Sequence, residues 1–223
     1  MATTTAGAAL LLGLGALSAT PATPAQAAAA APSSTTLTLS ATSSAYGQTV
    51  TASASVVVSP GPASGDVVFA VDGLAYKANL GAAGTATLVL PDAAVGTHAV
   101  TATFVPQDAV LQQGSTSPAQ PWTVGRVRTR LQPRVVGKGL RTPTSLVLTA
   151  SGEYGSVPGG EVRVRLQRHG RLRATERVGL TGAPVRVGFG RLPRGAYRVV
   201  VRYAGDASHL PEKRVVRFRV RQR

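Results

Sequence analysis

The chain has 223 residues, a formal net charge of +15 and no cysteine. This length allows two domains of ordinary size, and the lack of cysteine excludes a disulfide framework, a thiolate nucleophile and thiolate metal ligands. Aromatic residues make up only 4% of the chain, which argues against a sugar-stacking platform or a base-stacking groove.

The N-terminal segment resembles an export signal. Residues 8–19 form an apolar run that is too short to span a bilayer, and the small residues at 25–27 suit a cleavage site. We therefore expect a signal peptide at residues 1–27 and a short flexible leader at 28–34. No Lys or Arg precedes the run, so a disordered leader is the alternative. We expect no transmembrane segment later in the chain.

The first half shows the period-two alternation of β-strands and no useful helical period. Asp72-Gly73 is a strong signal for a hairpin turn. Strands are expected at residues 36–40, 49–57, 67–71, 86–90, 98–105 and 121–124. Even spacing of this kind is typical of a β-sandwich.

The second half repeats this order. Residues 96–104 recur as 195–203, and each copy leads to an aspartate, Asp108 or Asp206. The second set of strands is expected at residues 127–131, 145–150, 161–166, 184–189, 197–203 and 215–221. We therefore predict an all-β chain of two tandem sandwich domains at 35–124 and 126–223, with the boundary at Gly125.

Several motifs resemble the bacterial Ig-like repeats found in tandem in secreted and surface proteins. The first copy carries Tyr46-Gly47-Gln48, Gly65-Asp66-Val67-Val68-Phe69 and Gly96-Thr97-His98, and the second keeps Gly160-Glu161-Val162 and Gly195-Ala196-Tyr197. The resemblance implies two Greek-key Ig-like sandwiches of about seven strands each, used for spacing, adhesion or binding. It supplies no catalytic residues.

The two halves differ sharply in charge. Every arginine lies at or after Arg126, whereas residues 1–125 contain one basic residue, Lys77. The formal charge is −3 for residues 1–125 and +18 for residues 126–223. A genome-wide preference for arginine would affect both copies, so the asymmetry needs a local cause.

Strand parity predicts where the arginines point. In the strands expected at 161–166, 197–203 and 215–221, buried-type apolar residues alternate with arginines. If these strands take the C, F and G places of an Ig sandwich, they lie side by side in one sheet. The arginines expected on its outer face are Arg163, Arg165, Arg198, Arg202, Arg217, Arg219 and Arg221.

These seven arginines are the candidate site for a polyanion, since guanidinium groups bind phosphate and carboxylate oxygens well. The expected partners are an anionic cell-wall polymer or an acidic glycan, with nonspecific attraction to nucleic acid; the alternative is a solvated face with no dedicated ligand. The first copy lacks such a face, because its equivalent positions are Val68, Ala70, Ala99, Thr101 and Thr103.

Residues that could carry catalysis or bind metal are few. His98 aligns with Tyr197, where Ig-type domains often keep a tyrosine corner, and His169 lies in a predicted turn. Asp206 and His209 share one loop, but adjacency does not give triad geometry. We expect no catalytic residue, cofactor or metal site.

The leading hypothesis is an exported, non-catalytic tandem Ig-like protein, secreted or attached to the cell surface. Its basic second domain would attach to an anionic polymer while the first domain acts as a spacer. The alternative is a purely structural spacer, or the remnant of a larger repeat protein, with no dedicated ligand.

Overall fold

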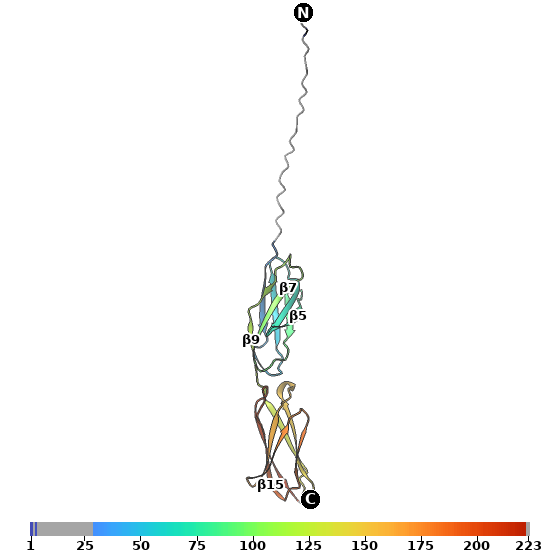
Figure 1. Ribbon diagram of the computed structural model, residues 1–223, viewed down its shortest axis with the longest axis vertical. Coiled ribbons are helices and arrows are strands. Elements are labelled where there is room, and N and C mark those ends of the chain that lie inside the picture. The colour runs from blue at the N-terminus through green and yellow to red at the C-terminus, as the bar shows by residue number, and fades with distance from the viewer. Residues whose placement is uncertain (2, 4–28, 222–223) are drawn as a thin grey trace.

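The computed structural model describes residues 1, 3 and 29–221. The expected signal peptide therefore lies almost wholly outside the described residues. The described chain consists of strands that build two β-sandwiches placed end to end (Figure 1). Its single helical element is a short 3-10 turn at Glu153–Gly155. The prediction of an all-β, Ig-like chain is confirmed.

The first sandwich has a three-stranded and a six-stranded sheet. The smaller sheet has the order β1-β3-β6, and the larger has the order β2-β9-β7-β4-β5, with β8 also pairing with β7. The strands are β1 (Ser33–Leu39), β2 (Ser43–Ala45), β3 (Thr51–Val58), β4 (Gly65–Val71), β5 (Leu74–Asn79), β6 (Thr85–Val89), β7 (Gly96–Pro106), β8 (Ser115–Thr116) and β9 (Gln120–Gly125).

The second sandwich packs a three-stranded sheet, β10-β11-β14, against a four-stranded sheet, β13-β12-β15-β16. The strands expected as C, F and G are therefore neighbours, as β12, β15 and β16. The strands are β10 (Thr129–Val136), β11 (Thr144–Gly152), β12 (Glu161–Arg168), β13 (Arg171–Gly179), β14 (Val185–Gly190), β15 (Gly195–Tyr203) and β16 (Glu212–Val220).

Each sandwich has its own hydrophobic core, built by alternation of buried and outward-facing residues along central strands such as β4 and β12. In β4 the side chains of Val67 and Phe69 are fully buried, and in β12 those of Val162 and Val164 are equally buried. The two clusters share no residue. Burial of an apolar side chain of this size stabilises a fold by about 1.5–3 kcal/mol, so each sandwich has its own source of stability.

Four strands escaped prediction: the short strands β2 and β8, and the longer edge strands β5 and β13. β5 and β13 lie at the edges of the larger sheets, and most of their residues are exposed or half-buried. Because they bury little on either face, they lack the apolar alternation by which the central strands were recognised. The predicted turn before β5 is confirmed: Asp72 and Gly73 have φ values of 49° and 85°, as a tight hairpin turn requires.

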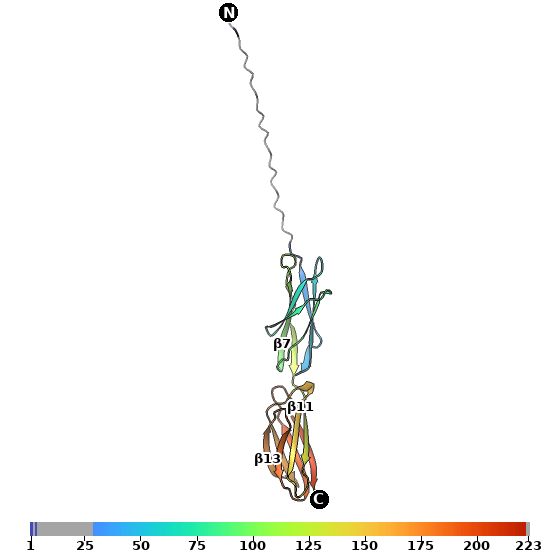
Figure 2. The same cartoon turned by 90° about the vertical axis from the view of Figure 1, so that its right-hand side faces the viewer.

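The two sandwiches meet end to end at a small junction (Figure 2). The ring of Tyr46, from the loop between β2 and β3, packs edge-on against His209 of the second sandwich with 5.9 Å between centroids. The backbone N–H of Tyr46 also donates to the carbonyl of Gly125, at the end of β9. Tyr46 therefore contacts the linker and the second sandwich together.

Candidate polyanion-binding face

The larger sheet of the second sandwich presents the predicted arginines to solvent. Arg163 and Arg165 lie on β12, and all seven predicted side chains are exposed. Six of them come from the three neighbouring strands; the seventh, Arg221, follows β16 and pairs with Gly139 through an isolated bridge. The remaining four are Arg198 and Arg202 on β15 and Arg217 and Arg219 on β16.

Cross-strand register divides these arginines into rows. Arg163 is directly opposite Arg202, and Arg198 is directly opposite Arg217. Between these pairs lies a mostly apolar row, in which Arg165 faces Val200 and Val200 faces Val215. Val200 is 7% exposed, so the positive surface is interrupted rather than continuous.

The structure adds two basic residues that the sequence analysis did not include. Arg177 on β13 is opposite Arg163, and Lys213 on β16 is opposite Arg202. Arg177, Arg163, Arg202 and Lys213 thus form one line across all four strands of the sheet, which we call the cation row. Lys213 could have been found by extending the alternation of the last strand backward by one step. Arg177 could not, because β13 itself was not recognised.

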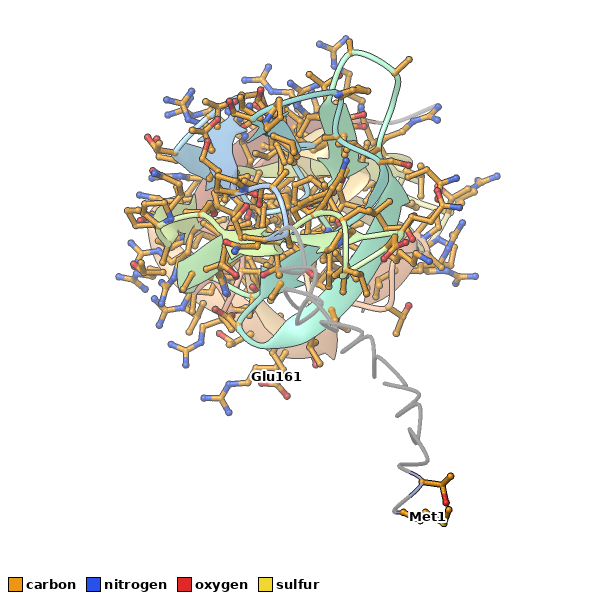
Figure 3. All side chains as sticks on the ribbon, turned by 90° about the horizontal axis from the view of Figure 1, so that it is seen from above. Met1 and Glu161 are labelled. Atoms are coloured by element: carbon orange, nitrogen blue, oxygen red, sulfur yellow. The ribbon has the colours of Figure 1, made fainter. Side chains whose placement is uncertain are left out.

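The cation row lies in a surface groove of about 740 Å³. The loop between β15 and β16 forms part of its wall through Ala204, Gly205 and Pro211, and Glu161 lies at its margin. Seen along the molecule, Glu161 projects outward from the sandwich, and nitrogen-bearing side chains surround the outline (Figure 3).

Two carboxylates, those of Glu161 and Glu212, line the same groove, but in the described chain neither lies within 4.0 Å of a cation of the row. Among the described residues, the ion pairs within 4.0 Å are Lys77–Asp66, His98–Asp72, His209–Asp206 and Arg214–Glu212. Like charges placed directly opposite one another destabilise a sheet. Repulsion among the four cations therefore destabilises this part of the sheet, and a bound anion would reduce that repulsion.

The other sheet of the second sandwich carries less charge. Its exposed arginines include Arg130 and Arg134 on β10 and Arg186 on β14, and both Arg134 and Arg186 flank Val147. The excess of positive charge thus surrounds the sandwich, but it is densest on the sheet that holds the cation row.

The predicted tyrosine corner is confirmed in both sandwiches. The Tyr197 hydroxyl donates to the carbonyl of Pro193 at 2.9 Å, and the Nε2–H of His98 donates to the carbonyl of Ala94 at 2.8 Å. Each side chain therefore reaches the carbonyl four residues upstream. His98 also donates through Nδ1 to Asp72 at 2.6 Å, which explains how histidine replaces tyrosine at this corner.

Asp206 organises the loop that forms the wall of the groove. Its carboxylate accepts hydrogen bonds from the backbone N–H groups of Gly159, Ser208 and His209 and from the Tyr203 hydroxyl, all at 2.7–2.8 Å. Burial raises the pKa of Asp206, but the hydrogen bond from Gly159 and those from its other donors outweigh burial and hold the pKa well below its usual range. Burial, followed by the adjacent carboxylate, raises the pKa of Tyr203, so its hydroxyl remains a donor.

The sequence analysis missed a contact between this loop and Ser156. His209 Nδ1 donates to Asp206 at 2.9 Å, and His209 Nε2 lies 3.0 Å from Ser156 Oγ. The atoms are connected as in a serine triad. However, the Ser156 hydroxyl donates its proton to the Glu153 carbonyl at 2.8 Å, and the His209 ring is only 2% exposed beneath Tyr46. The arrangement suits a structural tie at the junction.

No group of three or more His, Cys, Asp or Glu side chains in residues 1, 3 and 29–221 is placed to hold a metal ion. In that same part of the chain, no helix has the length and apolar character needed to cross a membrane.

Several known proteins resemble this chain. Residues 37–125 match the family described as bacterial Ig-like domain (group 3), whereas no curated protein sequence matches. Similar solved structures include the fibronectin(III)-like modules of Clostridium thermocellum CbhA, with 19% identity over 83% of this chain and 94% of that one and a TM-score of 0.31. A two-domain fibronectin type-III segment of chicken tenascin has 11% identity, 82% and 97% coverage and a TM-score of 0.41.

The Yersinia pseudotuberculosis adhesin InvE is similar at 17% identity, with 82% of this chain and 58% of that one covered and a TM-score of 0.34.

Ig-like domains typically serve as binding or structural modules rather than as enzymes, and many are extracellular. The family match, the sheet topology and the repeated motifs agree with one another. Residues 37–125 match the bacterial Ig-like domain family, and the described chain folds as two β-sandwiches in tandem.

Proposed function

We propose that this protein is an exported, non-catalytic surface module whose second sandwich attaches it to an anionic polymer while the first sandwich acts as a spacer. The observation that supports this proposal is the contrast between equivalent sheets. The second sandwich exposes six of the seven predicted arginines along β12, β15 and β16 and the seventh, Arg221, just after β16, whereas the first has no arginine at all.

Charge reversal tests the polymer-binding part of the proposal. The full chain with Arg165, Arg202 and Arg219 changed to Glu should elute from immobilised heparin at a much lower salt concentration than the wild type. Binding of a basic surface to the anionic groups of a polymer is electrostatic, and it weakens steeply as the salt concentration rises. Circular dichroism should show that the variant melts as a folded protein. Equal elution of the two proteins would overturn polymer binding and favour the purely structural spacer.

Cell fractionation tests the location. In the organism that encodes the chain, the protein should appear in the wall fraction at low ionic strength and move to the medium at high ionic strength, since exposed charge pairs are screened by salt. Recovery in the cytoplasmic fraction at both ionic strengths would contradict export.

A further inference from the structure

We propose that the primary ligand site is the groove over the cation row, and that it takes one chain of an anionic carbohydrate polymer laid across the strands. This inference rests on the proposed function, which it deepens by naming one site and one ligand class. It differs from a diffuse basic face, because it predicts that exposed arginines on the same sheet contribute unequally to binding.

The first argument is electrostatic. Three directly opposed like-charge pairs follow one another in the row: Arg177 with Arg163, Arg163 with Arg202, and Arg202 with Lys213. In the row that contains Arg165, this arginine is the single cation. The row that contains Arg198 has two cations, Arg198 and Arg217. Anion binding should therefore be strongest where cation–cation repulsion is greatest.

The second argument is the comparison with the first sandwich. The equivalent row there consists of Lys77, Val68, Thr103 and Thr116. Its one cation is neutralised by Asp66 at 2.7 Å, and its two threonine hydroxyls lie 3.0 Å apart. The same backbone thus folds well with a neutral row, so the four cations of the second sandwich are not required by the fold.

The third argument is geometric. Neighbouring strands are about 4.8 Å apart, so the row places four cations over about 14 Å. This spacing is comparable with the length of one sugar or polyol unit, and it suits a polymer with one anionic group on each unit. The loop residues Ala204, Gly205 and Pro211 border the groove on one side, which directs an extended chain along the row.

The fourth argument concerns the rest of the groove. Glu161 is exposed beside the row and is outside ion-pair distance of the cations in the described chain; its carboxylate can accept hydrogen bonds from hydroxyl groups. Tyr203, the aromatic residue of the lining, is 3% exposed and presents no face for stacking. A hydroxyl-bearing polyanion fits these groups better than a nucleic acid, which would use stacking.

The test compares two variants of the full chain that lose the same charge. R163V/R202T introduces the residues that occupy this row in the first sandwich, and R198T/R217T removes a directly opposed arginine pair outside the row. The probes are polyol phosphate oligomers, oligogalacturonates and single-stranded DNA of matched charge, measured by titration calorimetry at low salt. The phosphate and carboxylate probes distinguish the two sources of an anionic carbohydrate.

We expect R163V/R202T to weaken carbohydrate binding by about tenfold or more, because two close charge contacts are lost, and R198T/R217T to weaken it by at most about threefold. Affinity should increase with oligomer length up to four charged units, one for each cation of the row, and then level off. The melting temperature of R163V/R202T at low salt should equal or exceed that of the wild type.

Each other outcome has a distinct meaning. Equal weakening by both variants would overturn the groove as the primary site and leave the basic face as the binding surface. Tight, row-dependent binding of DNA would overturn the assignment to carbohydrate. Absence of wild-type binding to every probe would reject the proposed function itself.

Discussion

The protonation of His98 can be followed by fluorescence, because its ring lies next to that of Trp122. The hydrogen bond to Asp72, then that to the Ala94 carbonyl, raises the pKa of His98 above its ordinary value of 6.5, and the hydrogen bond from His98 is the main cause that lowers the pKa of Asp72 below 3.8. The bond therefore stabilises the first sandwich fully between these ordinary values. Its contribution is lost as pH rises through the folded-state pKa of His98 or falls through that of Asp72.

Trp122 allows this titration to be followed at one site. It is the single tryptophan of the chain, and its ring centroid lies 5.4 Å from that of His98. Because a charged imidazole quenches indole fluorescence, the emission should rise with a midpoint above pH 6.5. The variant His98→Tyr, which introduces the residue found at the corner of the second sandwich, should give a flat profile. A wild-type midpoint at or below 6.5 would contradict the raised pKa.

Asp206 provides the corresponding prediction for the second sandwich. Asp206→Asn places an amide among N–H donors, and we expect it to lower the free energy of unfolding by about 2–4 kcal/mol at neutral pH. Since the pKa of Asp206 is lowered in the fold, the wild-type contribution is lost as pH falls below 3.8, so the difference between the two proteins should shrink in acid.

Urea unfolding can assign this effect to one sandwich. Circular dichroism follows both sandwiches, whereas Trp122 fluorescence follows the first, to which this residue belongs. In Asp206→Asn the dichroism transition should shift and the fluorescence transition should not. A shift of similar size in both signals would show that the two sandwiches unfold together.

At the scale of elements, the tight turn between β4 and β5 requires a left-handed backbone at Gly73, and this requirement does not come from crowding by neighbouring atoms. Gly73 has a φ of 85°, and a Cβ at this position would meet nothing within 4 Å. Gly73→Ala should therefore cost about 1–2 kcal/mol through left-handed strain alone. Gly73→Asn should cost less, because Asn tolerates this region. Equal losses in the two variants, measured by Trp122 fluorescence in urea, would contradict this cause.

The elements also show which features a sequence can predict. Central strands such as β12 and β15 were predicted because burial on one face imposes alternation, and the same parity placed Arg163 and Arg202 on the outer face. The edge strand β13 was missed because none of its residues is buried and its sequence shows no sustained apolar alternation, and Arg177 was missed with it. The contact between His209 and Ser156 joins residues 53 positions apart, and no local pattern signals such a pair.

At the scale of the whole molecule, the junction fixes how the two sandwiches are joined. Gly47, with a φ of 80°, lies beside the second sandwich, where a Cβ would be in ordinary van der Waals contact with the Tyr154 carbonyl oxygen at 3.4 Å. Together with the packing of Tyr46 on His209, this contact ties the first sandwich to the loops that carry Ser156 and Asp206. We therefore expect the junction to hold the groove at a fixed distance from the far end of the first sandwich.

Removal of the Tyr46 ring should release this restraint. In the wild type, residual dipolar couplings from both sandwiches should fit one alignment tensor; in Tyr46→Ala they should require two. Tyr76→Ala, which truncates a tyrosine on the edge strand β5, is the matched control and should retain one tensor. Two tensors in the wild type would show that the junction is a hinge.

The parallel pairing of β2 with β9 has a mechanical consequence. Ser43–Ala45 run alongside Thr123–Gly125, so tension between the two ends of the first sandwich pulls these segments past each other and loads their hydrogen bonds in shear, all at once. Among the described residues of the second sandwich, parallel contacts are the single bridges Val127–His209 and Gly139–Arg221. Under a steady pull, the second sandwich should extend first, and the first sandwich should stay folded.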